Sequence, residues 1–167
     1  METKIIDCSF ARFKFIRIIM VTKALEIIKG WIGREVDDSR SPAGNWMKPR
    51  IESVEKGKIA LSVLIRREMC NPFGNIHGGM MALVIDESIG WAIVSLEAEG
   101  HYTSVNLNID FLYAAAQGER ITAHAQIIRH GKKIINSEVH VYNESGTLLS
   151  KATSNLVSTG MVIKPKD

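Results

Sequence analysis

The chain has 167 residues, 46% hydrophobic and 23% charged, which is the composition of a folded globular domain with a sizeable core. Its formal net charge of +3 is too weak to indicate a nucleic-acid-binding protein, although it is compatible with an anionic ligand. No apolar run reaches the roughly 20 residues that a membrane-spanning helix needs. We therefore expect one domain that neither binds nucleic acid nor spans a membrane.

Cysteine and histidine usage gives no sign of a disulfide framework or a metal cluster. Cys8 and Cys70 are the only cysteines and lie far apart in the sequence. The five histidines show no metal-ligand spacing on any expected helix face. We therefore expect a reducing compartment, a cytoplasmic location and no structural metal.

The segment Phe10–Met20 is both basic and apolar. It could be a poor signal-like segment, an amphipathic helix, or translated sequence upstream of a true start at Met20. Arg12, Lys14 and Arg17 interrupt its apolar stretch, and no cleavage site follows. These features disfavour a secretory signal.

The first half of the chain is expected to form a helix, a loop and two strands. Apolar residues at helical spacing predict a helix over about 22–33, with Thr22 as its N-cap. Residues 37–49 are rich in Asp, Ser, Pro, Gly and Asn and are predicted to be a loop. Two strands follow, over 50–55 and 58–66, around a Glu-Lys-Gly-Lys turn.

The second half is expected to form one long helix and four strands. Gly78 to about Glu97 predicts the helix, because no turn signal appears before Gly100. The strands are rich in β-branched residues or alternate in polarity, and they cover 103–113, 119–129, 133–142 and 148–158. In the first of them, alternation assigns Val105, Leu107, Ile109 and Phe111 to one face and Asn106, Asn108 and Asp110 to the other.

This order of elements predicts an α+β fold. Consecutive strands joined by short turns form an antiparallel sheet, and a helix that is apolar almost all round must be covered on most sides. A curved antiparallel sheet wrapped around the long central helix meets both requirements. We expect this single domain over 45–160, an extension over 1–44 that carries the first helix, and a tail over 161–167.

The long predicted helix carries two acids, Asp86 and Glu87, within its apolar pattern. A buried carboxylate is costly unless it is hydrogen-bonded or paired, so the simpler interpretation places both on a narrow wet face or against a nearby turn. Gly78 and Gly79 begin the helix, where free N–H groups can bind an anion or a polarised carbonyl oxygen. The glycines could instead serve only the turn, and His77 could be a cap, a loop-orienting residue or a proton-transfer group.

Helix geometry restricts how these residues can act together. Asp86 lies eight residues after Gly78, which is roughly 12 Å along a helix axis. A catalytic group must come within about 3 Å of its target, or act through one water. A shared site therefore requires an oligomer, and a two-fold dimer with antiparallel central helices would bring Gly78 of one chain opposite Asp86 of the other.

Residues 71–92, N-P-F-G-N-I-H-G-G-M-M-A-L-V-I-D-E-S-I-G-W-A, resemble the signature of the hotdog-fold acyl-CoA thioesterases of the PaaI type. That family's pattern is an asparagine, a glycine, His-Gly-Gly and an acid, which here are Asn71, Gly74, residues 77–79 and Asp86. The similarity continues through 103–112, 118–119 and 129–132 and covers about 45–160. It is fairly specific for the fold and less so for the reaction.

The resemblance implies roles for the residues of the signature. The Gly78 N–H would polarise the thioester carbonyl and stabilise the oxyanion. Asp86 of the facing subunit would activate water as a general base, or attack directly. Asn71 would position the water or the carbonyl, and His77 would hold the loop and contact the thioester.

The resemblance also implies roles further along the chain. Ser104 would orient Asp86 or its water, with Thr103 as the adjacent alternative. Gly79 would be part of the substrate-binding turn, and Gly131 and Lys132 would lie near the nucleotide of coenzyme A. Lys132 could equally be a solvated turn residue.

The resemblance implies an acyl-CoA thioesterase that releases the free acid and coenzyme A from a medium-chain or aryl thioester. It would act as a homodimer or homotetramer with sites at the subunit interface, and with no cofactor, since coenzyme A is part of the substrate. The alternatives are an enoyl-CoA hydratase or dehydratase, which would use a His-acid pair, and a non-catalytic acyl-CoA-binding domain. Ala114-Ala115, where the family commonly has Pro-Ala, and the N-terminal extension are expected to affect pantetheine contacts and the acyl pocket.

Overall fold

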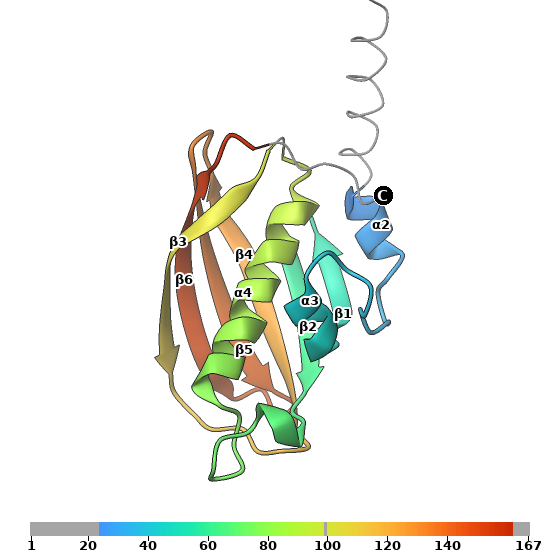
Figure 1. The fold of residues 1–167 in the computed structure, drawn as a ribbon, viewed down its shortest axis with the longest axis vertical. Coiled ribbons are helices and arrows are strands. Elements are labelled where there is room, and N and C mark those ends of the chain that lie inside the picture. Colours follow the sequence, from blue (N-terminus) through green and yellow to red (C-terminus); the bar gives the residue numbers. More distant parts are fainter. Residues whose placement is uncertain (1–23, 99, 162–167) are drawn as a thin grey trace, which may run out of the picture.

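A computed structural model describes residues 24–98 and 100–161 of the chain. The basic segment Phe10–Met20, the predicted cap Thr22 and the tail beyond residue 161 lie outside the described residues. The architecture is a curved antiparallel sheet around one long helix, with a short N-terminal helix (Figure 1). The predicted α+β fold is therefore confirmed.

Six strands form one sheet in the order β1-β2-β4-β5-β6-β3, and each neighbouring pair is antiparallel. The strands are β1 (Arg50–Glu55), β2 (Lys58–Leu64), β3 (Tyr102–Phe111), β4 (Arg120–His130), β5 (Ile134–Asn143) and β6 (Leu148–Ser158). The helices are α2 (Ala24–Lys29), α3 (Pro42–Met47), α4 (Gly78–Ser95) and the short 3-10 helix η1 (Arg67–Met69). Figure 1 shows α4 lying across the sheet, with α2 and α3 beside it near β1 and β2.

The N-terminal helix is shorter than the predicted span of 22–33. It ends at Lys29, and Gly33 has a φ of +81°, which lies outside helical geometry. Ile32 and Glu35 instead form bridges to β1. Backbone pairing at the edge of the sheet thus replaces the last helical turn.

The prediction of a loop throughout 37–49 is wrong over α3. Ser41 is the N-cap of this helix and accepts a hydrogen bond from the Gly44 N–H at 3.0 Å, and a proline occupies the first turn. Lys48 ends the helix in the left-handed conformation, with a φ of 55°. The cap and the proline were the local signs of this helix within an otherwise loop-like composition.

Arg66 forms hydrogen bonds to the C-terminal end of α3. Its guanidinium donates to the carbonyls of Met47 at 2.9 Å and Trp46 at 2.8 Å, and it lies 5.0 Å from the centre of the Trp46 ring. Strand β2 accordingly ends at Leu64, two residues before the predicted end at Arg66.

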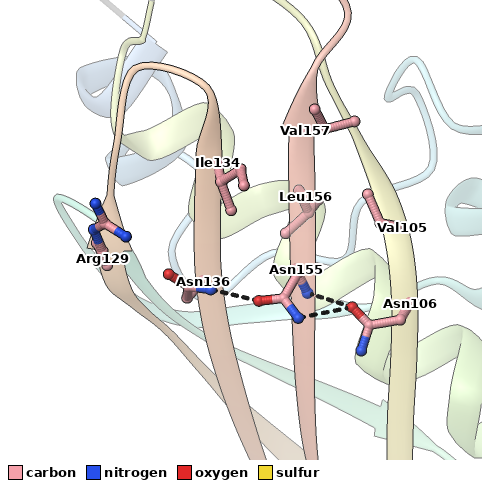
Figure 2. A pocket seen from close by; sticks show the side chains of 8 residues that line it. All are labelled: Val105, Asn106, Arg129, Ile134, Asn136, Asn155, Leu156 and Val157. Carbon is pink, nitrogen blue, oxygen red and sulfur yellow. Dashed lines mark hydrogen bonds between the residues drawn. The ribbon is translucent and has the colours of Figure 1, made fainter.

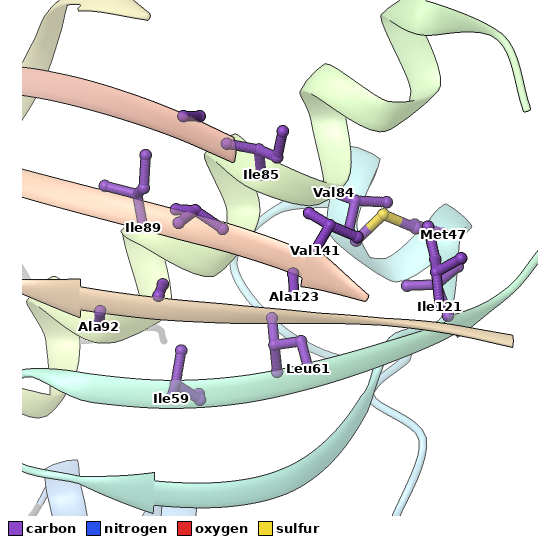
Figure 3. Close-up of a cluster of buried hydrophobic side chains, with 14 of the residues drawn as sticks. Met47, Ile59, Leu61, Val84, Ile85, Ile89, Ala92, Ile121, Ala123 and Val141 are labelled. Carbon is purple, nitrogen blue, oxygen red and sulfur yellow. The ribbon is translucent and has the colours of Figure 1, made fainter. Parts of the chain in front are cut away.

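The core lies between α4 and the sheet. The buried face of α4 comprises Met81, Val84, Ile85, Ser88, Ile89, Ala92 and Ser95. Figure 3 shows several of these side chains against residues of β2, β4 and β5. The two buried serines donate to carbonyls within the helix, Ser88 to Val84 and Ser95 to Ala92, each at 2.7 Å, so they leave no unpaired hydroxyl.

Within the described part of the chain, α4 is the one helix long and apolar enough to cross a membrane by length and composition. Core helices of globular proteins share these properties, and α4 packs one face against the sheet.

Burial in this core predicts that two leucines of β2 contribute differently to the free energy of unfolding. Leu61 is 0% exposed and Leu64 is 43% exposed. We expect Leu61→Ala to lower the free energy of unfolding by about 2–5 kcal/mol, because it leaves a cavity, and Leu64→Ala by less than about 1 kcal/mol. Denaturant unfolding of both variants measures the difference, and equal losses would contradict this account of the core.

Candidate functional site

The first turn of α4 leaves one backbone donor free. The Gly79 N–H donates to the His77 Nδ1 at 2.9 Å, and the Met80 and Met81 N–H groups donate to the His77 carbonyl at 2.9 and 3.0 Å. The Gly78 N–H has no acceptor among the described residues. It therefore stands at the positive end of α4 as a donor available to a ligand.

The hydrogen bond between His77 and Gly79 fixes the tautomer of His77 and occupies the Gly79 N–H. Because Nδ1 accepts a hydrogen bond, the neutral ring carries its proton on Nε2, an assignment that follows from the hydrogen bond. The Gly79 N–H is committed to this cap. A Cβ on Gly79 would lie only 3.2 Å from Nδ1, so glycine lets the ring close over the turn.

Asn71 shapes the loop that leads into α4. Its Oδ1 accepts from the N–H groups of Phe73 at 2.9 Å and Asn75 at 3.2 Å, while Gly74 supplies a φ of +79°. The Asn71 Nδ2 makes no hydrogen bond to any described residue. Asn71 thus holds the loop with its oxygen and keeps its nitrogen as a donor.

A hollow of about 290 Å³ lies beside the free donor. Asn71, Gly78 and residues 111–114 are among the residues that line it. Phe111 is close to the donor, because a Cβ built on Gly78 would lie 3.5 Å from the Phe111 Cζ. The hollow therefore joins the Gly78 N–H, the Asn71 amide and an apolar wall.

Asp86 lies on the uncovered face of α4, where Gly90 and Val94 are also exposed. The Ser104 Oγ donates to the Asp86 Oδ1 at 3.3 Å. The structure therefore brings together Ser104 and Asp86, a pair that the sequence suggested. Thr103, the neighbouring strand residue, faces the other side of the sheet.

A β-bulge explains why Ser104 faces α4. The β3–β6 register shifts between Ser104 and Asn106, so Val105 is an extra residue. Val105 is 67% exposed, and the prediction that it shares a face with Leu107 is wrong. Strict alternation would have turned Ser104 away from α4, and the bulge reverses it.

Glu87 points to α3 rather than to the hollow. It accepts a hydrogen bond from the Ser41 Oγ. Burial raises the pKa of Glu87, the Ser41 hydrogen bond partly offsets this, and the negative charge of Asp86 raises it further. A Cβ on Gly44 would lie 2.6 Å from the Glu87 Oε2, so glycine leaves room for the carboxylate. Asp86 and Glu87 are adjacent in the sequence but have different surroundings. The difference arises because Glu87 is bonded by Ser41, which lies 46 positions away in the sequence.

Gly131 and Lys132 lie in the turn between β4 and β5, at the end of the sheet opposite the start of α4 (Figure 1). The Gly131 N–H donates to the Ile134 carbonyl at 2.9 Å. A Cβ on Gly131 would lie 2.8 Å from that same oxygen, so the tight turn itself requires glycine. Lys132 is exposed. Within one chain, neither residue reaches the hollow beside Gly78.

No group of three or more His, Cys, Asp or Glu side chains is placed to hold a metal ion within residues 24–98 and 100–161. One chain places a backbone N–H and an amide at the hollow, and a carboxylate with its hydroxyl partner further along α4. They can bind a carbonyl oxygen and accept a proton from water.

Comparison with known proteins matches residues 73–150 to the thioesterase superfamily. Human acyl-coenzyme A thioesterase 13 is 28% identical over 131 residues, which cover 76% of this chain and 89% of that protein. The 1,4-dihydroxy-2-naphthoyl-CoA hydrolase of Listeria monocytogenes is 33% identical over 101 residues, 59% of this chain and 80% of that protein. The fold resembles that of the E. coli PaaI protein with a TM-score of 0.70 and 20% identity, over 75% of this chain and 89% of that one.

The surroundings of Glu87 predict a pH-dependent contribution to stability. Its pKa in the folded chain lies above the ordinary value of 4.5, so its contribution is fully present below that value and is lost as the pH rises through the folded pKa. Glu87→Gln stays neutral and keeps an acceptor for Ser41. We expect it to be stabilised relative to the wild type by a margin that grows as the pH rises above the ordinary value of 4.5.

Urea unfolding of the wild type and of Glu87→Gln across this pH range measures the margin. Glu144→Gln, at an exposed turn position, is the matched control for replacing a carboxylate by an amide. A margin for Glu87→Gln that does not vary with pH would contradict the expected effect of burial.

Proposed function

This chain belongs to the thioesterase superfamily and is a thioester hydrolase of the PaaI-type hotdog fold, and we propose that it hydrolyses an acyl-CoA, medium-chain or aryl, to the free acid and coenzyme A. The observation that carries the proposal is the free Gly78 N–H at the start of a helix whose open face bears Asp86. The names of the human and Listeria relatives, which specify acyl-CoA and aryl-CoA substrates, support the class of thioester.

The proposed chemistry assigns one task to each group. The Gly78 N–H donates to the thioester carbonyl and to the oxyanion that forms on it. Asp86 takes a proton from the water that adds to the carbonyl carbon, or adds to that carbon itself. The C–S bond then breaks and the coenzyme A sulfur leaves as a thiolate, which takes a proton from Asp86 where Asp86 acted as the base, or from solvent where Asp86 added directly. In the second case water then hydrolyses the acyl-Asp86 anhydride, which releases the free acid and restores the carboxylate. Ser104 holds the Asp86 carboxylate, and the Asn71 Nδ2 is a second donor for the carbonyl or the water.

His77 completes the first turn without a proton-transfer step. Its Nδ1 engages the Gly79 N–H, so its role in the proposal is to hold the loop and leave Gly78 as the free donor. Coenzyme A enters only as part of the substrate, and the proposed steps use no further cofactor.

The proposed site needs two chains. Gly78 and Asp86 are about 12 Å apart along one helix axis. Strand β3 ends the sheet, and no described residue pairs with its outer edge, whereas residues 32–35 bridge to β1 at the other end. A second copy paired along β3, with a two-fold axis near Ala82, would set each Gly78 opposite the other chain's Asp86.

This arrangement also gives a role to the turn between β4 and β5. In one chain the turn lies at the end of the sheet away from Gly78 (Figure 1). In a dimer with antiparallel helices, the end of the sheet that carries the turn in one chain lies beside the start of α4 in the other. The turn of one chain would therefore approach Gly78 of the other. Lys132 could then meet the anionic nucleotide of coenzyme A, while Gly131 keeps the turn tight.

Loss of the Asp86 carboxylate should abolish most of the activity. We expect Asp86→Asn to lower kcat on the best substrate by about 100-fold or more, because the amide cannot accept a proton from water. Asp110→Asn is the matched control, since Asp110 lies on β3 in an exposed pair with Lys151. Thiol release from short, medium, long and aryl acyl-CoAs provides the measurement, and full activity of Asp86→Asn would refute its assigned role.

A mixing experiment tests whether the site spans two chains. Gly78→Pro removes the free N–H, and proline is suited to the first turn of a helix after the extended His77. Asp86→Asn and Gly78→Pro should each be inactive alone. Random mixing should restore roughly a quarter of the wild-type activity, because half of the dimers are mixed and each of these has one intact site of its two.

Gly78→Ala, which keeps the N–H, controls for the added side chain. Confirmed mixed dimers without activity, or an active monomer by gel filtration, would refute a site shared between chains.

A further inference from the structure

We infer that Asn106 is a positioning residue for hydrolysis, which acts through the bulge at Val105 on Ser104 and thereby on Asp86. The inference rests on the proposed function, because it assumes that Asp86 takes part in the reaction. Asn106 itself faces the outside of the sheet and does not line the hollow beside Gly78.

The register of β3 and β6 shows where the bulge acts. Ser104 is opposite Leu156 and Asn106 is opposite Asn155, so two steps along β3 correspond to one step along β6. In a regular strand, Ser104 and Asn106 would share a face. The extra residue, Val105, lets Ser104 face α4 while Asn106 faces outward.

Asn106 supplies an acceptor at the irregular position. Its Oδ1 accepts from the backbone N–H of Asn155 at 3.0 Å and from the Asn155 Nδ2 at 2.9 Å. A side chain thus satisfies a strand N–H beside the shift in register. The Ser154 Oγ donates to the Asn106 carbonyl at 2.7 Å, which holds the same residue from its backbone side. The backbone N–H of Asn155 must meet an oxygen, which fixes the orientation of the Asn106 amide.

The Asn106 amide continues into a row across three strands. The Asn136 Nδ2 donates to the Asn155 Oδ1, which connects β5 to β6 and so to β3. Figure 2 shows the three amides side by side, with Val105 above Asn106 at the bulge. They line an outer hollow of about 490 Å³. The row ties the bulge to an interior strand of the sheet.

Loss of the Asn106 acceptor would leave the Asn155 N–H unpaired and favour a shift toward regular pairing. Such a shift turns Ser104 away from α4. The Ser104–Asp86 hydrogen bond is already long at 3.3 Å, so a small displacement suffices to break it. The expected effect is on the rate of the reaction rather than on substrate binding.

Four variants test this coupling. Asn106→Ala removes the acceptor and should lower kcat about fivefold or more, with KM little changed, as Ser104→Ala should. Asn106→Asp keeps an acceptor and should retain most of the wild-type kcat. Asn108→Ala is the matched control, because Asn108 lies on the same strand and makes no side-chain hydrogen bond to a described residue.

A double-mutant cycle then separates positioning from general damage. If Asn106 acts through Ser104, Asn106→Ala should not lower kcat further in the Ser104→Ala background. The inference would be overturned if the reductions in kcat caused by Asn106→Ala and Ser104→Ala multiplied in the double variant. It would also be overturned if Ser104→Ala kept the wild-type kcat. If Asn106→Ala does not fold, Asn106→Leu in the same cycle decides, because it also removes the Oδ1 acceptor for the Asn155 N–H but keeps a side chain of similar shape. Asp86→Asn, assayed in parallel, distinguishes failure of the proposed function from failure of this inference. An active Asp86→Asn refutes the proposed function. An inactive Asp86→Asn, together with reductions in kcat that multiply, refutes only the coupling of Asn106 to Ser104.

Discussion

Burial of one face of α4 against the sheet is the interaction on which the site depends. Residues from Met81 to Ser95 along that face are buried, and this fixes the rotation of the helix about its axis. Rotation decides that Asp86 meets β3 and that Glu87 meets α3. The hydrophobic core therefore orients both acids, although it contains neither.

The Gly78 N–H is left free because polar contacts satisfy the neighbouring N–H groups. The first turn of a helix presents several unpaired N–H groups, and here His77 takes those of Gly79, Met80 and Met81 with its ring and its carbonyl. What remains for a ligand is the Gly78 N–H. The cap of α4 therefore satisfies every N–H of the first turn except that of Gly78.

The fold, and the placement of several candidate site residues, could be predicted from the sequence because they depend on local patterns. Alternation and turn residues located all six strands, and the uninterrupted apolar run located α4. Ser104 could be paired with Asp86 only through the family resemblance. Alternation alone gave the wrong face, because no residue type marks the extra position at Val105. Contacts between distant segments were equally hidden, such as those of Arg66 and Glu87 with the region of α3.

The two ends of the sheet differ in a way that limits how copies of the chain can join. Bridges from residues 32–35 occupy the outer side of β1, while β3 is left open. Two chains that meet along β3 use the one available edge of each and form a continuous sheet with both ends blocked. In the proposed dimer, the bridges from residues 32–35 would therefore oppose further strand addition at β1.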